Sequence, residues 1–111
     1  MLFRSKHSGY GWTGVPIMAA NMDGVGTLQM AHALYKHQMF TCLVKTVDPA
    51  YLQTTIQDIG CNHFAVSTGT SESDFIRLSK ILNEHLEIKF ICIDVANGYQ
   101  ERFAEIGRAH V

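Results

Sequence analysis

The chain has 111 residues, 47% of them hydrophobic and 17% charged, which is the composition of one globular domain with enough apolar surface for a core. The formal net charge of −1 gives no signal of the basic surface expected of a nucleic-acid-binding protein, and no apolar run reaches the roughly 18 residues that a membrane span needs, so we expect neither partner. Three cysteines, an odd number, favour reduced thiols in a cytoplasmic protein. No paired Cys or His motif indicates a metal site.

Short apolar segments alternate with segments of helical period. Four nearly continuous apolar segments predict strands buried on both faces, at residues 15–21, 39–45, 63–68 and 89–95. Apolar stripes between them predict four helices. These lie over 27–37, from 49 to about 60, after residue 71 and from about Gln100. This β-α alternation predicts a single domain with parallel strands and right-handed crossovers.

The predicted helices have recognisable ends. Asp48 followed by Pro49 is typical of a helix start, and Gly60 stands where a left-handed residue would end that helix. Ser71 and Asp74 resemble a capping box with Asp in place of the usual Glu or Gln. Cys42 and Cys92 lie inside apolar segments, which favours buried, unreactive thiols.

Polar residues follow each predicted strand, and in a parallel sheet all of these strand ends lie on one rim. The residues are Asn21, Lys45, Ser67 with Thr68, and Asp94 with Asn97. Lys45 could form a structural ion pair, donate a proton or bind an anion, and Asp94 could be its partner across adjacent strands. Polar strand ends are common in α/β domains, so this pattern alone indicates no particular reaction.

Two glycine-containing turns invite a phosphate-binding interpretation. Gly24 and Gly26 begin a dinucleotide-binding fingerprint, but position 29, where the third glycine belongs, is Gln29. The turn at Gly69 precedes a capped helix and could present N–H groups to an anion, although a simple strand-to-helix turn is the favoured interpretation.

Three strings carry a resemblance to a known family. KHSGYGWTGVPIMAANMDGVGT (6–27), FAVSTGTSESDF (64–75) and FICIDVANGY (90–99) closely resemble GMP reductases, of the IMP dehydrogenase/GMP reductase family. The likeness runs in one register from about Phe3 to about Ala104, which implies a partial barrel domain over residues 1–104, and the combination of AANMD and DVANGY favours the reductase branch. The resemblance implies the first four βα units of a (β/α)8 TIM barrel, an α/β fold with parallel strands.

The resemblance also implies an activity: reductive deamination of GMP to IMP and ammonia with NADPH, in a cytoplasmic homotetramer. It implies a catalytic role for Lys45, contacts with the NADPH cofactor at Thr46, Asp94, Val95 and Ala96, and a place near the purine for Asn21 and Met22. The family's potassium site would lie in the missing half of the barrel.

Two departures from the family pattern concern these residues. Val44 and Thr46 flank the lysine where the family has histidines, which affects the proton network and the contact at Thr46. Gly24 replaces a threonine in the loop after the first strand.

A complete barrel needs about 250 residues, so this chain would supply only half of one. The family's nucleophilic cysteine belongs to a Gly-Ser-Val-Cys-Thr-Thr loop after strand six, which this sequence lacks. The final EIGRAHV (105–111) departs from the family and can be spelled by codons of a common sequencing adapter, so we expect a non-native tail. We therefore expect the chain alone to be inactive and to self-associate or aggregate through its open edges.

Two other interpretations remain open. The chain could belong to an IMP dehydrogenase-type enzyme or another nucleotide-binding barrel. It could instead be a non-catalytic α/β module that binds a nucleotide or a partner chain.

Overall fold

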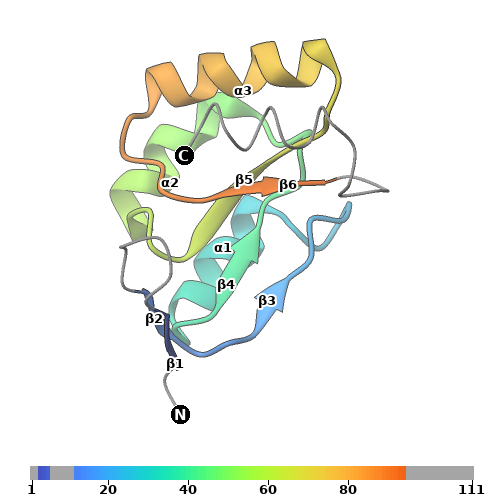
Figure 1. Cartoon of the computed structure of the whole chain (residues 1–111). Helices are drawn as coiled ribbons and strands as arrows, with labels where there is room; N and C mark the ends of the chain where they lie inside the picture. Colours follow the sequence, from blue (N-terminus) through green and yellow to red (C-terminus); the bar gives the residue numbers. More distant parts are fainter. Residues whose placement is uncertain (1–2, 6–11, 95–111) are drawn as a thin grey trace.

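A four-stranded parallel sheet forms the centre of the structure (Figure 1). The computed structural model describes residues 3–5 and 12–94. Neighbouring strands pair in the spatial order β3, β4, β5, β6, and all three pairings are parallel. The strands are β3 (Met18–Ala19), β4 (Phe40–Cys42), β5 (Phe64–Thr68) and β6 (Ile91–Ile93). Each lies inside one of the four predicted apolar segments, so the predicted order of parallel strands is confirmed.

Helices connect consecutive strands and cover one face of the sheet (Figure 1). They are α1 (Leu28–Tyr35), α2 (Leu52–Ile59), which follows the short 3-10 helix η2 (Pro49–Tyr51), and α3 (Glu72–Glu84). The predicted caps are present. The Asp48 carboxylate accepts from the Ala50 amide at 2.9 Å, and the Ser71 hydroxyl accepts from the Asp74 amide at 3.1 Å. Gly60 ends α2 with φ of 71°, a conformation that favours glycine. The helix predicted near Gln100 lies outside the described residues.

The main hydrophobic core lies between the sheet and the helices. Alternate residues of the strands point to this side, as the side-chain period of two requires. The buried members of the main core are Ala31, Leu43, Leu52, Ile59, Cys61, Phe64, Val66, Leu78 and Ile81. A smaller buried cluster, Phe40, Cys42 and Ala65, lies on the opposite face of the sheet and packs against Trp12, Phe90 and Cys92. We call that opposite face the inner face, because no helix of the described part covers it.

The first strand differs from the prediction. Residues 15–21 were expected to be buried on both faces, yet Ile17 is 55% exposed and Met18 is 60% exposed. The prediction is wrong for these residues because β3 is an end strand of the sheet and its inner face lacks a covering layer. An apolar run predicts burial only where another element is present to supply it.

Two short strands that the sequence did not predict precede the sheet. β1 (Phe3–Ser5) pairs antiparallel with β2 (Trp12–Gly14). Trp12 ties this pair to the sheet, because its indole Nε1 donates to the Asn62 carbonyl at 2.7 Å and its ring meets Phe40 edge-on at 6.1 Å. Three-residue strands carry too little alternation for sequence reasoning to detect, so their pairing becomes visible only in three dimensions.

The thiols follow the expectation of burial in part. Cys42 is buried and Cys92 is half-buried, and both lie on the inner face. Burial, with the neighbouring Cys92 as a second cause, raises the pKa of the Cys42 thiol to about 12. Cys42 Sγ also lies 3.2 Å from Met18 Sδ. A thiol in this environment stays protonated at neutral pH and is a poor nucleophile.

Candidate functional site

Polar groups lie at the carboxyl ends of the four strands and form a rim, on which Lys45 and Asp94 are exposed. Asn21 follows β3 and Asp94 follows β6, 73 residues apart in sequence. The Asn21 Nδ2 nevertheless donates to the Asp94 Oδ2 at 3.2 Å. Because β3 and β6 are the two end strands of the sheet, this bond shows that the sheet curves enough for side chains that follow them to meet across the rim. Two of the predicted site residues are thereby brought together.

Lys45 follows β4, and its partner differs from the one expected. Its Nζ lies 3.5 Å from both carboxylate oxygens of Asp74, in the first turn of α3. The expected pairing with Asp94 across adjacent strands is wrong, because β5 separates β4 from β6. The lysine therefore reaches the helix that follows β5 and not the end of β6. Its side chain is 48% exposed, so the ammonium remains accessible from solvent.

Asp74 is held by its own helix as well as by the lysine. It belongs to the capping box that begins α3, in which its amide donates to the Ser71 hydroxyl. Burial opposes ionisation of its carboxyl, but hydrogen bonds from Ser71 and the nearby Lys45 ammonium outweigh that effect and lower the pKa of Asp74. The carboxylate thus serves as a fixed negative charge beside the N-terminus of α3, where it also complements the helix dipole. It takes the place that an anion would occupy, which argues against an anion site at this turn.

Acidification should destabilise the protein partly through Asp74. Because its folded-state pKa lies below the unfolded value of about 3.9, its contribution is complete above that value and is lost as the pH falls through the folded pKa. We expect the stability of Asp74→Asn to decline less steeply with acid than that of the unmodified chain, in urea titrations between pH 6 and 2.5. Asp23→Asn, at an exposed loop position, is the matched control and should follow the unmodified chain. Parallel curves for the unmodified chain and Asp74→Asn would contradict this account.

Gly69 leaves the space in which Lys45 and Asp74 meet. A β-carbon at this position would overlap the Asp74 carboxylate and would lie 3.4 Å from Lys45 Nζ. Thr68, the last residue of β5, is buried, and its hydroxyl donates to the Gly69 carbonyl at 3.1 Å. The close approach, and not the backbone conformation, favours glycine here, because a methyl group would have to displace the end of the Asp74 side chain.

Gly69→Ala should therefore cost about 1–3 kcal/mol of stability, as overpacking typically does. Asp74→Ala removes the group that the new methyl would strike. We expect the double variant Gly69→Ala/Asp74→Ala to be less destabilised than the sum of the two single variants, measured by urea unfolding at pH 7. Additive effects would show that the carboxylate does not occupy the space beside Gly69.

The loop after β3 is fixed against β4, which positions Asn21. A β-carbon on Gly26 would overlap the Cys42 carbonyl and come within 2.8 Å of the Ala20 carbonyl, and the Gly26 carbonyl accepts from the Val44 amide at 2.8 Å. Gly24 has φ of 75°, so the departure from the family's threonine occurs where the backbone itself favours glycine. Of the two glycines that resembled part of a dinucleotide fingerprint, Gly26 thus allows close packing of the loop and Gly24 allows its backbone conformation.

The remaining predicted site residues take no part in these pairs. Met22 and Thr46 are exposed, and Val95 and Ala96 lie outside the described residues. Sequence reasoning missed Asp74 and Gly69 as members of the site, because it assigned them only to a helix cap and a turn. Both residues belong to the segment STGTSESD (67–74), whose turn and helix cap could be recognised from the sequence. Only the tertiary structure shows that this turn faces Lys45.

One further polar group lies beneath the rim. The Ser67 hydroxyl is buried, and no partner for it exists among residues 3–5 and 12–94. Ser67 pairs in register with Cys92, which places both on the inner face. Within the same described ranges, no group of three His, Cys, Asp or Glu side chains could hold a metal ion, and no helix is long and apolar enough to cross a membrane.

Comparison with known proteins identifies relatives of this chain. GMP reductase from Edwardsiella ictaluri is 48% identical over 109 residues, which cover 96% of this chain and 31% of that protein. GMP reductases from Serratia proteamaculans and Shewanella halifaxensis are 48% and 44% identical over 91% and 96% of the chain. In sequence, this chain is a relative of the GMP reductases. No protein-family model matches it.

The chain spans about three tenths of the length of the GMP reductases that it matches. Among solved structures, inosine 5′-monophosphate dehydrogenase from Legionella pneumophila superposes with a TM-score of 0.71 at 20% identity, over 87% of this chain and 29% of that protein. At this identity the match concerns the fold alone. The prediction of a partial (β/α)8 barrel with parallel strands is confirmed, and the rim described above is the carboxyl end of its first four strands.

Proposed function

We propose that the chain supplies the cofactor-side wall of a GMP reductase active site. The parent reaction is the NADPH-dependent reductive deamination of GMP to IMP and ammonia, in a cytoplasmic homotetramer. The observation that carries this proposal is the 44–48% identity to GMP reductases over nearly the whole chain. The relationship includes the segments in which Asn21, Lys45 and Asp94 lie.

The groups on the rim fit a nicotinamide cofactor. Asp94 is exposed and carries carboxylate oxygens that can accept from a carboxamide N–H, and Asn21 holds one of them in place. Thr46 is exposed beside Lys45 and offers a hydroxyl. When bound, NADPH would supply the hydride. Val95 and Ala96 are proposed to contact the nicotinamide end together with Asp94, and Met22 is proposed to lie near the purine with Asn21.

Lys45 is proposed to protonate the departing amine or to bind an anionic group of the ligand by its charge. Ammonia leaves more readily once its nitrogen is protonated, and a positioned acid typically accelerates such a step 10²–10⁴-fold. Asp74 keeps the ammonium in place while leaving about half of the side chain accessible. Neither role requires the histidines that flank the lysine in the family, because Asp74 comes from a different strand-to-helix connection.

The nucleophile would come from another part of the barrel. Cys42, Cys61 and Cys92 do not serve, because Cys42 and Cys61 are buried with raised thiol pKa values and Cys92 faces the small inner cluster. We accordingly expect the 111-residue chain alone to show no oxidation of NADPH with GMP, measured at 340 nm. Potassium, if required, would bind to the same absent part.

A chimera tests the proposal directly. The matching segment of the Edwardsiella ictaluri GMP reductase is replaced by residues 1–104 of this chain, and NADPH oxidation is measured with GMP and, as a control substrate, with AMP. We expect a folded chimera with GMP-dependent activity. A folded chimera that binds GMP but never oxidises NADPH would refute the assignment.

Calorimetry provides a second measurement on the chain as it stands. If the rim is the cofactor side, the 111-residue chain should bind NADPH weakly, and Asp94→Ala should weaken that binding further. Binding of GMP in preference to NADPH would place this wall on the substrate side instead.

A further inference from the structure

Lys45 and Thr46 occupy the centre of a tight turn on the rim. The turn runs from Val44 to Val47, and the Val47 amide donates to the Val44 carbonyl at 3.1 Å. Both central side chains are exposed. The neighbours of the lysine, Val44 and Thr46, carry no charge that could direct its ammonium. The position of Lys45 therefore depends on the contacts that other elements make with this turn.

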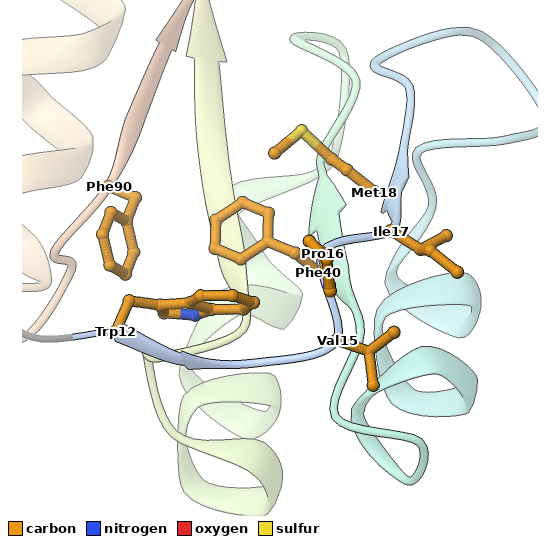
Figure 2. Close-up of a pocket in the computed structure, with 7 residues that line it drawn as sticks. All are labelled: Trp12, Val15, Pro16, Ile17, Met18, Phe40 and Phe90. Atoms are coloured by element: carbon orange, nitrogen blue, oxygen red, sulfur yellow. The ribbon is translucent and has the colours of Figure 1, made fainter. Parts of the chain in front are cut away.

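The cleft on the inner face lies at the opposite end of the strands from this turn. It has a volume of about 350 Å³, and Met18, Phe40 and Phe90 are among the side chains that line it (Figure 2). Met18 and Phe40 are the first residues of β3 and β4, and Phe90 directly precedes β6. Lys45, in contrast, lies beyond the last residue of β4. The side-chain contacts that the structure describes at the turn come from the helix side of the sheet.

Helix α3 contacts the turn at two points. The Asp74 carboxylate lies 3.5 Å from Lys45 Nζ, and Arg77 Nη2 donates to the Val47 carbonyl at 2.7 Å. Asp74 and Arg77 are three residues apart in α3, so they lie on the same face of the helix. One contact concerns the end of the lysine side chain, and the other concerns the backbone at the end of the turn.

The contact of Arg77 is the shorter and the less exposed of the two. A hydrogen bond with an ionised donor is usually about 2.7–2.9 Å long and roughly twice as strong as a neutral one. Arg77 is half-buried and its bond has this length, whereas the Lys45 side chain is 48% exposed and lies 3.5 Å from its carboxylate. An exposed ion pair of that length contributes little. The bond from Arg77 therefore determines the position of the turn more than the ion pair does.

The turn is held at both of its ends. At the first end, the Val44 amide donates to the Gly26 carbonyl at 2.8 Å, which joins the turn to the loop after β3. At the other end, the Val47 side chain packs against the main core and the Val47 carbonyl accepts from Arg77. Lys45 and Thr46 lie between these two fixed residues. Removing Arg77 would release the second end of the backbone while leaving the first in place.

We propose that Arg77 is a positioning residue for Lys45, because its bond to the Val47 carbonyl fixes the turn from which the lysine reaches the rim. The inference rests on the proposed role of Lys45 in the reduction of GMP and deepens it. Arg77 acts through the turn and not on the reacting atoms. The sequence contains no local signal of this role, because 30 residues separate Arg77 from Val47.

Arg77→Met, introduced into the chimera with the Edwardsiella ictaluri enzyme, removes the donor and keeps most of the length of the side chain. We expect kcat to fall about 10–100-fold, the scale expected of a misplaced catalytic group, with KM for GMP unchanged. Arg77→Lys keeps a charged donor and should restore part of the loss. Lys80→Met removes an exposed positive charge from the same helix, so it is the matched control and should leave kcat unchanged.

A double variant separates positioning of the lysine from a general loss of stability. If Arg77 acts through Lys45, the variant Lys45→Ala/Arg77→Met should be no slower than Lys45→Ala alone. A further loss of kcat in the double variant would show that Arg77 acts elsewhere and would overturn the proposal. An unchanged kcat in Arg77→Met would overturn it as well.

Amide hydrogen exchange of the 111-residue chain distinguishes a failure of this inference from a failure of the proposed function. In Arg77→Met we expect the Val47 amide to exchange about tenfold faster, because the turn opens more often, and the Gly60 amide at the end of α2 to be unaffected. Faster exchange together with an unmodified chimera that never oxidises NADPH would support the hold of Arg77 on the turn and refute the GMP reductase assignment. Unchanged exchange at Val47 would overturn the positioning role, whatever the activity of the chimera.

Discussion

Phe64→Ala should remove most of the chain's stability. Phe64 lies in β5, a central strand, and is 1% exposed within the main core. Truncating a buried phenylalanine typically costs about 3–5 kcal/mol, through lost burial and through the cavity left behind. The total stability of a domain of this size is about 5–15 kcal/mol, and a partial barrel with an uncovered face belongs at the low end of that range.

The measurement is thermal unfolding followed by far-UV circular dichroism at fixed protein concentration. We expect the midpoint to fall by about 15–30 °C, or the cooperative transition to disappear. Tyr51→Ala is the matched control, because Tyr51 is also aromatic but is 62% exposed. Equal losses for the two variants would show that the packing around β5 is not what stabilises the chain.

Lys45→Ala, introduced into the chimera described above, should lower kcat by about 10²–10⁴-fold, the contribution expected of a positioned proton donor. Lys80→Ala, on the exposed side of α3, should leave kcat unchanged. The folded state of each variant is checked by its unfolding midpoint, since Lys45 also forms an ion pair with Asp74.

Lys45→Arg separates the possible roles of the lysine. Arginine keeps the charge but does not release a proton, so it rescues a charge-holding role and fails to rescue proton donation. If Lys45→Ala lowered stability without lowering kcat, the lysine would be only a structural partner of Asp74. If kcat fell and Lys45→Arg restored it, the ammonium would act as an anion ligand.

Features that depend on residues near one another in the sequence could be predicted, whereas contacts between distant residues could not. The sequence alone predicted the four parallel strands, the caps at Asp48 and Ser71 and the end of α2 at Gly60. These features depend on residues within a few positions of one another, or on burial patterns that repeat along one element. The resemblance to GMP reductases likewise rests on three continuous segments of the sequence and needs no knowledge of the fold.

Only the tertiary structure decided which groups meet on the rim. Lys45 pairs with Asp74 because strand order places the turn after β5 beside β4, and Asn21 meets Asp94 because the sheet curves. Neither fact has a counterpart in the spacing of residues along the chain. The apolar run of the first strand predicted burial, and this is wrong for Ile17 and Met18, because their exposure depends on what covers the inner face. The sequence by itself thus determined the strands, their order of succession and the family resemblance, whereas side-chain partners and the open face follow from distances across the sheet that only the folded chain defines.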